Sequence, residues 1–502
     1  MNICLFFLHN NYDYEVTIML KDIDKVVEKL KKDTNNNGDI IYREKYINKQ
    51  KIYVIYNEPL CSSEMISNFI IRSLDFIDNK YKRKVDIVSV IKNDINNFKV
   101  KEASTYEDVC FYLHNAFTII LVEGSDVALA MENKGALARG INKPSTENTL
   151  RGPMDAFVEN IQINLGLIRR RIKDNRLWSK EYFLGRYTKT KINILYVDGV
   201  AKKEIVEQVD KLIKKIDIDG VINLGTIKNF IQKENKSAFP TMITTERPDH
   251  VCQALLKGKI AIVMDNCPFV LILPTVFNDF FLSLEDSANQ SINISFTRIV
   301  RYIAFFITVL TPGIYIAITT YNQEMLPTEL LISFAGQRSS VPFPAFFEAL
   351  LMTLSFEILR ESDLRIPSSS SSALSIVGAL ILGEAAVNAG IVSPIMIIVV
   401  SITMISSLLF IEPDFINGIR WWRLFFMLGG SFMGIIGIVL VFIAFMIKIA
   451  SINSFGKPYL MPFAPTSVEG LKNSVIRFPT RKLNKREKYL SDNTYRMGGS
   501  KK

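Results

Sequence analysis

The chain has 502 residues, a net charge of +10 and 48% hydrophobic residues, so it is long enough for several domains. Five scattered cysteines without a C-x-x-C pair argue against a disulfide scaffold or a structural zinc site, and favour a reducing compartment. The sequence contains no glycine-rich phosphate loop, H-E-x-x-H or G-x-S-x-G motif. It therefore predicts no catalytic residues, no bound cofactor and no metal site.

Two pairs of similar segments indicate a duplication in the first half of the chain. The segments "KIYVIYNEPLCSSEMISNFIIRSL" from Lys51 and "KINILYVDGVAKKEIVEQVDKLIKKI" from Lys191 each read as a strand, a turn and a helix. The segments "YLHNAFTIILVEGSDVALAM" from Tyr112 and "ALLKGKIAIVMDNCPFVLIL" from Ala254 each read as a helix end and a β-hairpin. The two offsets, 140 and 142 residues, agree closely. We predict two duplicated α/β subdomains, at 1–135 and 136–290, in which strands alternate with helices.

A helix is predicted between the two repeats, in "RGPMDAFVENIQINLGLIRRRIK" at 151–173. Its apolar residues recur at helical spacing, and Pro153 suits the first turn of a helix. Arg169, Arg170, Arg171 and Lys173 cluster at its end, where cations complement the helix dipole. We expect these cations at a solvated helix end or a subunit contact rather than in a nucleic-acid site.

Charges thin out after about residue 298, and the sequence predicts a helical transmembrane domain at 291–450. About 20 apolar residues in a helix cross the hydrocarbon core of a bilayer. Five segments are candidates: 302–321, 341–358, 370–389, 392–411 and 424–447. Glu348 and Glu357 interrupt the second, which is therefore expected to be a partly buried or interfacial amphipathic helix.

The tail at 451–502 is basic, with ten Lys or Arg against two acidic residues from Lys472 onward. The positive-inside rule places such a tail in the cytoplasm. The N-terminal residues "MNICLFFLHNNYDYE" do not resemble a signal peptide. We therefore expect both the α/β subdomains and the tail to be cytoplasmic, with an even number of spans between them.

Several stretches resemble the signature segments of the A subunits of the GerA family of spore germinant receptors. They are "RGPMDAFVENIQINLGLIRRRIK", "TTERPDHVCQALLKGKIAIVMDNCPFVLILPTVFNDFF", "PFPAFFEALLMTLSFEILRE", "SIVGALILGEAAVNAGIVSPIMIIVV" and the closing "PYLMPFAP" and "VIRFPTRKLNKR". The resemblance implies a protein of the spore inner membrane, in which the termini expected to be cytoplasmic lie on the spore core side. It also implies B and C partner subunits and a ring-shaped homo-oligomer with an ion-conducting pore. One departure is the run of five serines after Pro367, where relatives are expected to be more mixed.

The stretch "SSSSSALSIVGALILGEAAVNAG" places small residues along one face of a predicted helix. The face includes Ser372, Ser375, Ala379, Gly383 and Ala386. Small faces let membrane helices approach closely, so tight packing within one subunit is one interpretation. The other is a pore-proximal helix whose serine hydroxyls meet water.

Val377 and Glu384 share an adjacent strip of the same helix and complete the predicted pore-lining or pore-proximal set. A carboxylate within a span normally faces protein or water. Glu384 could bind an ion, or it could be a protonated or hydrogen-bonded packing group. The sequence thus predicts a membrane receptor-channel subunit that contacts lipid and binds no nucleic acid. The alternatives are a secondary transporter or its accessory subunit, and a non-conducting scaffold.

Overall fold

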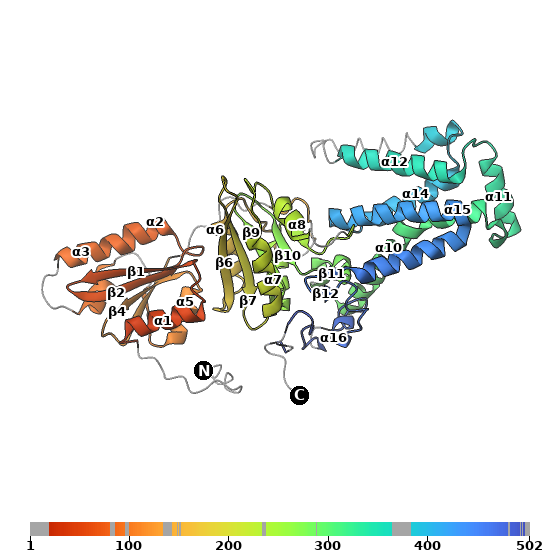
Figure 1. Cartoon of the computed structure of the whole chain (residues 1–502). Coiled ribbons are helices and arrows are strands. Elements are labelled where there is room, and N and C mark those ends of the chain that lie inside the picture. The colour runs from red at the N-terminus through yellow and green to blue at the C-terminus, as the bar shows by residue number, and fades with distance from the viewer. Residues whose placement is uncertain are drawn as a thin grey trace.

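The computed structural model of the chain describes residues 20–80, 86–95, 100–133, 143–147, 149, 152–232, 237–287, 289–363, 383–479, 482–491, 493 and 495–496. Figure 1 shows three parts in a row: a first sheet with its helices, a second sheet with its helices, and a group of long helices. We call these parts subdomain 1, subdomain 2 and the helical region. The C-terminal tail lies beside subdomain 2 and the start of the helical region.

Subdomain 1 is built on a five-stranded sheet with the order β1-β2-β4-β5-β3. Its strands are β1 (Ile40–Ile47), β2 (Gln50–Asn57), β3 (Val100–Ala103), β4 (Phe117–Val122) and β5 (Ala128–Glu132). Its helices are α1 (Ile23–Asp33), α2 (Ser63–Met65), the π-helical turn η1 (Ile66–Ile71), α3 (Arg72–Lys80), α4 (Ile87–Asp94) and α5 (Tyr106–Leu113). Every strand pairing recorded in this sheet is antiparallel.

Subdomain 2 has the same arrangement, with the strand order β6-β7-β9-β10-β8. Its strands are β6 (Leu177–Leu184), β7 (Thr190–Val197), β8 (Ile243–Thr245), β9 (Ile260–Met264) and β10 (Val270–Leu273). Its helices are α6 (Ile161–Arg169), α7 (Lys203–Lys214), α8 (Leu224–Gln232) and α9 (Pro248–Lys257). The predicted strands after Lys51 and Lys191 are β2 and β7, which hold equivalent places in the two sheets. The recorded pairings are again antiparallel, so helices alternate with strands without producing a parallel sheet.

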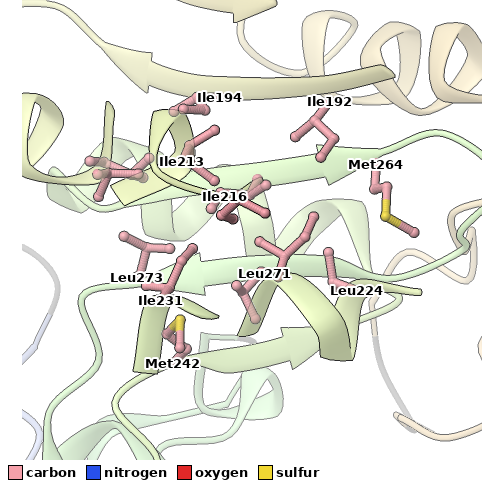
Figure 2. Packing of buried hydrophobic residues seen from close by; sticks show 14 of the residues in the cluster. Ile192, Ile194, Ile213, Ile216, Leu224, Ile231, Met242, Met264, Leu271 and Leu273 are labelled. Atoms are coloured by element: carbon pink, nitrogen blue, oxygen red, sulfur yellow. The ribbon is translucent and has the colours of Figure 1, made fainter. Parts of the chain in front are cut away.

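The second sheet is covered by helices on both faces, which explains its long apolar strands. Successive side chains of a strand point to opposite faces. In β9, Ile260 and Ile262 pack against the side of α7 and α8, whereas Ala261 and Val263 pack against the side of α6 and α9. Figure 2 shows the first of these cores, where Ile213 and its neighbours fill the space beside the sheet. The apolar run that begins at Ile260 is therefore a buried hairpin, as predicted, and not a membrane span.

Helix α6 differs from the prediction in where it begins and in the burial of Arg169 at its end. The helix begins at Ile161, capped by the Asn160 side chain, and not near Pro153. Arg169 at its end is only 2% exposed. Its Nε and Nη2 atoms donate to Asp39 Oδ2 of subdomain 1 at 3.0 and 2.6 Å. The expectation of a solvated helix end is thus wrong for Arg169, because this side chain is buried in the contact between the two subdomains.

The helical region contains α10 (Ser291–Thr320), α11 (Thr328–Arg338), α12 (Ala345–Asp363), α14 (Pro394–Ser407) and α15 (Pro413–Ser451). The short turns η2 (Phe277–Phe281), η3 (Leu284–Ser287) and η4 (Gln323–Met325) flank α10. Among the described residues, α10 and α15 are the helices whose length and apolar composition suffice to cross a membrane. Helix α14 is apolar but shorter.

Helix α15 is a hairpin of two arms, at 413–433 and 435–451. Gly434 has a φ of 60° and a ψ of −140°, which breaks the helix. The rings of Trp422 and Phe445 lie 4.9 Å apart, whereas 23 residues of unbroken helix would separate them by about 35 Å. Asn322 Oδ1, after α10, accepts a hydrogen bond from Ile435 N at 3.1 Å and stabilises the reversal. The prediction of one span at 424–447 is therefore wrong: this segment turns back on itself (Figure 1).

Both ends of the helical region lie on the same side, next to subdomain 2. The chain leaves subdomain 2 into α10 and returns to it through the second arm of α15, which leads to β11 (Asn453–Ser454), β12 (Lys457–Pro458) and α16 (Val468–Leu471). Tyr459 donates to the carbonyl of Pro240 at 2.9 Å, and Arg486 Nε donates to that of Leu256 at 3.0 Å. The tail is therefore fastened to subdomain 2.

Candidate functional site

Four of the seven predicted pore residues, Ser372, Ser375, Val377 and Ala379, lie outside the described residues. Gly383, Glu384 and Ala386 belong to a short helical stretch at 383–388. Gly383 is buried, and a Cβ at this position would lie 3.9 Å from two side-chain carbons of Ile397 in α14. Ala386 is half-buried against the same group of side chains, and Glu384 is exposed. The described part of the small face thus packs on α14, with Glu384 directed away from this contact.

An aromatic cluster, which sequence reasoning did not predict, joins subdomain 2 to the helical region. Its rings come from the connection before β8, from η2, from α10, from the connection between α14 and α15, and from the start and end of α15. They are Phe239, Phe277, Phe281, Phe305, Phe410, Phe415 and Phe445. Phe277 and Phe305 meet edge to face with centroids 5.3 Å apart, and buried aromatic pairs of this kind stabilise beyond the area they bury. The cluster makes the junction a packed core rather than a flexible linker.

Ion pairs beside the aromatic cluster fix α8 to the start of α15. Lys228 Nζ lies 3.3 Å from Glu412 Oε1, and it also pairs with Asp414. The backbone N–H of Thr244 in β8 donates to Glu412 Oε2 at 3.4 Å. Burial raises the pKa of Glu412, while the Lys228 ammonium opposes this shift. A displacement of α8 or β8 would therefore pull directly on the first turn of α15.

A small cavity of about 80 Å³ lies at this junction and includes titratable groups from both parts. Burial raises the pKa of Glu147 to about 7, and the nearby carboxylate of Glu246 adds to the shift. Thr245 Oγ1 donates to Glu147 Oε2 at 2.7 Å. His250 is also buried, and burial lowers its pKa to about 4. Glu147 can thus hold a proton near neutral pH, whereas His250 stays neutral there. The described residues contain no group of three His, Cys, Asp or Glu placed to bind a metal ion.

The two glutamates that interrupt α12 lie inside the helical region and have partners. Glu348 is 1% exposed, and its Oε2 accepts from the N–H and the hydroxyl of Ser393, both at 2.9 Å. Ser393 caps α14, so Glu348 supports the helix start and complements its dipole. Arg338 Nη2 lies 3.4 Å from Glu348 Oε1.

Glu357, two and a half turns further along α12, faces α15 instead. Its two carboxylate oxygens lie 2.8 Å from Arg420 Nη2 and 2.9 Å from Arg423 Nη2. Glu348 therefore lies near the start of α14, far from subdomain 2, and Glu357 near the start of α15, close to it. Helix α12 therefore runs from the side of the helical region that is far from subdomain 2 to the side that is close to it. The two glutamates that argued against a membrane span are paired within the helical region. The sequence shows that the apolar half contains both acidic residues and arginines, but it does not show which of them pair.

Comparison with known proteins gives the family. The family model described as "Bacillus/Clostridium GerA spore germination protein" matches residues 28–489. Spore germination protein KA of Bacillus subtilis (strain 168) is 39% identical over 460 residues, which cover 91% of this chain and 84% of that protein. The uncharacterized membrane protein YfkQ of the same organism is 34% identical, over 99% and 95% of the two chains.

A crystal structure of the N-terminal domain of the A subunit of the Bacillus megaterium spore germinant receptor GerK3 is also similar. It is 29% identical and covers 52% of this chain and 98% of its own, with a TM-score of 0.42. The family match spans most of the chain, including both subdomains, the helical region and most of the tail. The chain therefore belongs to the GerA family of spore germination proteins.

Proposed function

We propose that the chain is the A subunit of a nutrient germinant receptor in the spore inner membrane, where it acts with B and C subunits. Several copies form a ring around an ion-conducting pore, whose opening starts germination. The proposal keeps the four-part division at 1–135, 136–290, 291–450 and 451–502. Family membership supports the role in germination.

In the proposed topology, both termini lie on the cytoplasmic side, which is the spore core. The basic tail and the position of both ends of the helical region beside subdomain 2 support this arrangement. The two arms of α15 cross the membrane twice. Together with α10, α14 and the segment predicted at 370–389, they make five crossings, so an even total requires that α12 also crosses. The proposed crossings are then α10, α12, α14, the two arms of α15 and the segment predicted at 370–389, most of which lies outside the described residues. This differs from the sequence prediction, in which 341–358 did not cross.

We also propose that subdomains 1 and 2 arose by tandem duplication. Their equal strand order and the nearly constant offset of equivalent segments support this origin. A duplicated α/β unit outside the membrane favours a gating or assembly role over a secondary transporter, in which a repeat within the membrane part is common.

The observation that carries the gating role is the packed junction. Phe415 of α15 stacks on Phe280 with centroids 4.6 Å apart, and Lys228 holds the preceding turn. A rotation of subdomain 2 therefore cannot occur without moving α15 or breaking the aromatic cluster. Packed cores switch between discrete arrangements rather than deforming continuously, which suits a gate.

The pore prediction is tested with substitutions on and beside the small face. Gly383→Leu should abolish the nutrient response, because the added bulk jams the pore-proximal helix. Val377→Ala should favour ion leakage or premature germination, because it loosens the same helix. Gly336→Ala in α11 is the control, since a Cβ there meets no atom within 4 Å.

The measurement is ion leakage from spores, with the amount of receptor assayed in the same samples. Overpacking alone would cost about 1–3 kcal/mol and reduce the amount of assembled protein. If every variant loses activity only in proportion to lost protein, and none leaks, the small face serves packing and the channel proposal fails. Conductance of the purified protein in liposomes then separates a channel from a scaffold.

A further inference from the structure

An unbalanced group of arginines lies in a groove between α12 and the first arm of α15. Glu357 is shared between Arg420 and Arg423, and Arg423 is only 3% exposed. Arg360, on the next turn of α12, is close enough to interact with Glu357 and Arg420. Three guanidinium groups thus face one carboxylate. A net positive charge in an apolar helical region is costly unless an anion balances it.

The groove also contains polar atoms without a partner. The Nε atom of Arg420 and the hydroxyl of Thr353 are both buried and make no hydrogen bond in the described structure. Arg423 Nη1 contacts only the Met404 sulfur, at 3.8 Å, which is a weak acceptor. In this groove of about 540 Å³, Arg420 Nη1 donates to Asn417 Oδ1 at 3.0 Å, whereas Arg420 Nε has no acceptor and Arg423 Nη1 has only a weak one.

The groove changes character along its length. Helix α12 runs antiparallel to the first arm of α15, so Glu357 lies opposite Arg420 near subdomain 2, and Leu350 lies opposite Met427 further away. The polar end carries Asn417 and the arginines, and the other end carries leucines and a methionine. Trp421, which is 60% exposed, lines the polar end, and tryptophan is enriched at the level of lipid headgroups.

We propose that this groove binds one anionic phospholipid of the leaflet that faces the α/β subdomains. Its phosphate accepts hydrogen bonds from Arg420 and Arg423, and an acyl chain lies along the apolar end. Basic pockets between membrane helices bind acidic headgroups in this way. The apolar end favours a lipid over a free phosphate ion. The inference rests on the membrane location in the proposed function, but not on ion conduction.

The test compares the full-length protein in nanodiscs of phosphatidylcholine with and without phosphatidylglycerol, and counts retained lipids by native mass spectrometry. The wild-type protein should retain one phosphatidylglycerol in preference to phosphatidylcholine. Arg420→Gln should weaken this retention about tenfold or more, since it removes charge-assisted hydrogen bonds. Lys448→Gln is the matched control: Lys448 is an exposed cation near the end of the second arm of α15, outside the groove, and its loss should leave retention unchanged.

Glu357→Gln guards against misfolding as an explanation. It removes the competing carboxylate, so it should tighten retention, an effect that a damaged fold cannot produce. Equal retention of both lipids by wild type, equal loss in Arg420→Gln and Lys448→Gln, or displacement of the lipid by millimolar inorganic phosphate would each overturn the proposal. The proposal would also be overturned if a second copy of the chain covers the groove, which would be detected as cross-linking between copies through a cysteine at 421. Failure of the protein to insert into nanodiscs would instead count against the proposed membrane location.

Discussion

Replacing Gly434 by alanine should disturb the reversal of α15. The backbone at this position has a positive φ with a ψ of −140°, a combination that side chains disfavour. An added Cβ would lie 2.5 Å from Asn322 Oδ1 and 2.8 Å from Tyr321 Cβ. The substitution therefore strains the turn and displaces the amide that accepts from Ile435 N.

The magnitude follows from these two effects. The backbone strain costs roughly 1–3 kcal/mol, and the lost hydrogen bond costs about 1 kcal/mol. In an unbroken helix, the same change would instead gain roughly 0.5–1 kcal/mol. The balance between a reversed and a continuous α15 should thus shift by about 2.5–5 kcal/mol toward the continuous form.

Spin labels at Asn417 and Lys448, in a background without native cysteines, measure the shape of α15 directly. Both side chains are exposed. They lie 17 and 14 residues from Gly434, so packed antiparallel arms bring their backbones to about 10–15 Å. An unbroken helix would separate them by about 47 Å. We expect one short distance in the wild type, and a longer or broader distribution with a lower unfolding temperature in Gly434→Ala.

The control is Gly336→Ala, at an exposed helical glycine with free space around it, which should leave the distance and the unfolding temperature unchanged or slightly raise the latter. A distance near 47 Å in the wild type would refute the hairpin itself. A short, sharp distance in Gly434→Ala with unaltered stability would refute the argument that glycine is required there.

Two further predictions concern the α/β subdomains. Arg169→Met should destabilise the protein by about 3–5 kcal/mol in denaturant unfolding, because it leaves the Asp39 carboxylate buried without a partner. Adding Asp39→Leu should recover most of this loss. A double variant as unstable as the single one would contradict this reasoning. Glu147 has a pKa of about 7 in the folded protein, against an ordinary value of 4.5. Between these two pH values the folded state binds a proton that the unfolded state has lost, so the free energy of unfolding should fall as pH rises from about 4.5 to 7. Glu147→Gln should therefore match the wild type at pH 4 and exceed its stability at pH 8 by about 1–3 kcal/mol; equal pH profiles of the thermal midpoints would show that Glu147 does not titrate in this range.

Local features of the sequence were enough to predict the strands, the two similar α/β subdomains and the apolar half. Strands β9 and β10 are apolar on both faces because helices cover both sides of the sheet, and the turn between them interrupts the run at Asp265 and Asn266. Such patterns depend on residues close together in the chain. The offset of 140 residues similarly needs only the comparison of the chain with itself.

The partners of single charged side chains could not be predicted in this way. Arg169 meets Asp39 across 130 residues, and Glu357 meets Arg423 across 66. Nothing near Arg169 in the sequence distinguishes it from the neighbouring Arg170, which belongs to the same basic cluster. Whether a charge in an apolar helix faces lipid or a partner is decided only when the helices pack.

The sequence by itself determined that this chain has two similar α/β units, an apolar helical part and a basic tail, because periodicity and composition are local properties. Only the tertiary structure decided that α15 reverses at Gly434, because the reversal depends on Asn322 and Tyr321, more than a hundred residues earlier. It also decided the course of α12, because the cost of Glu348 and Glu357 in an apolar setting vanishes only beside their partners from α11, α14 and α15.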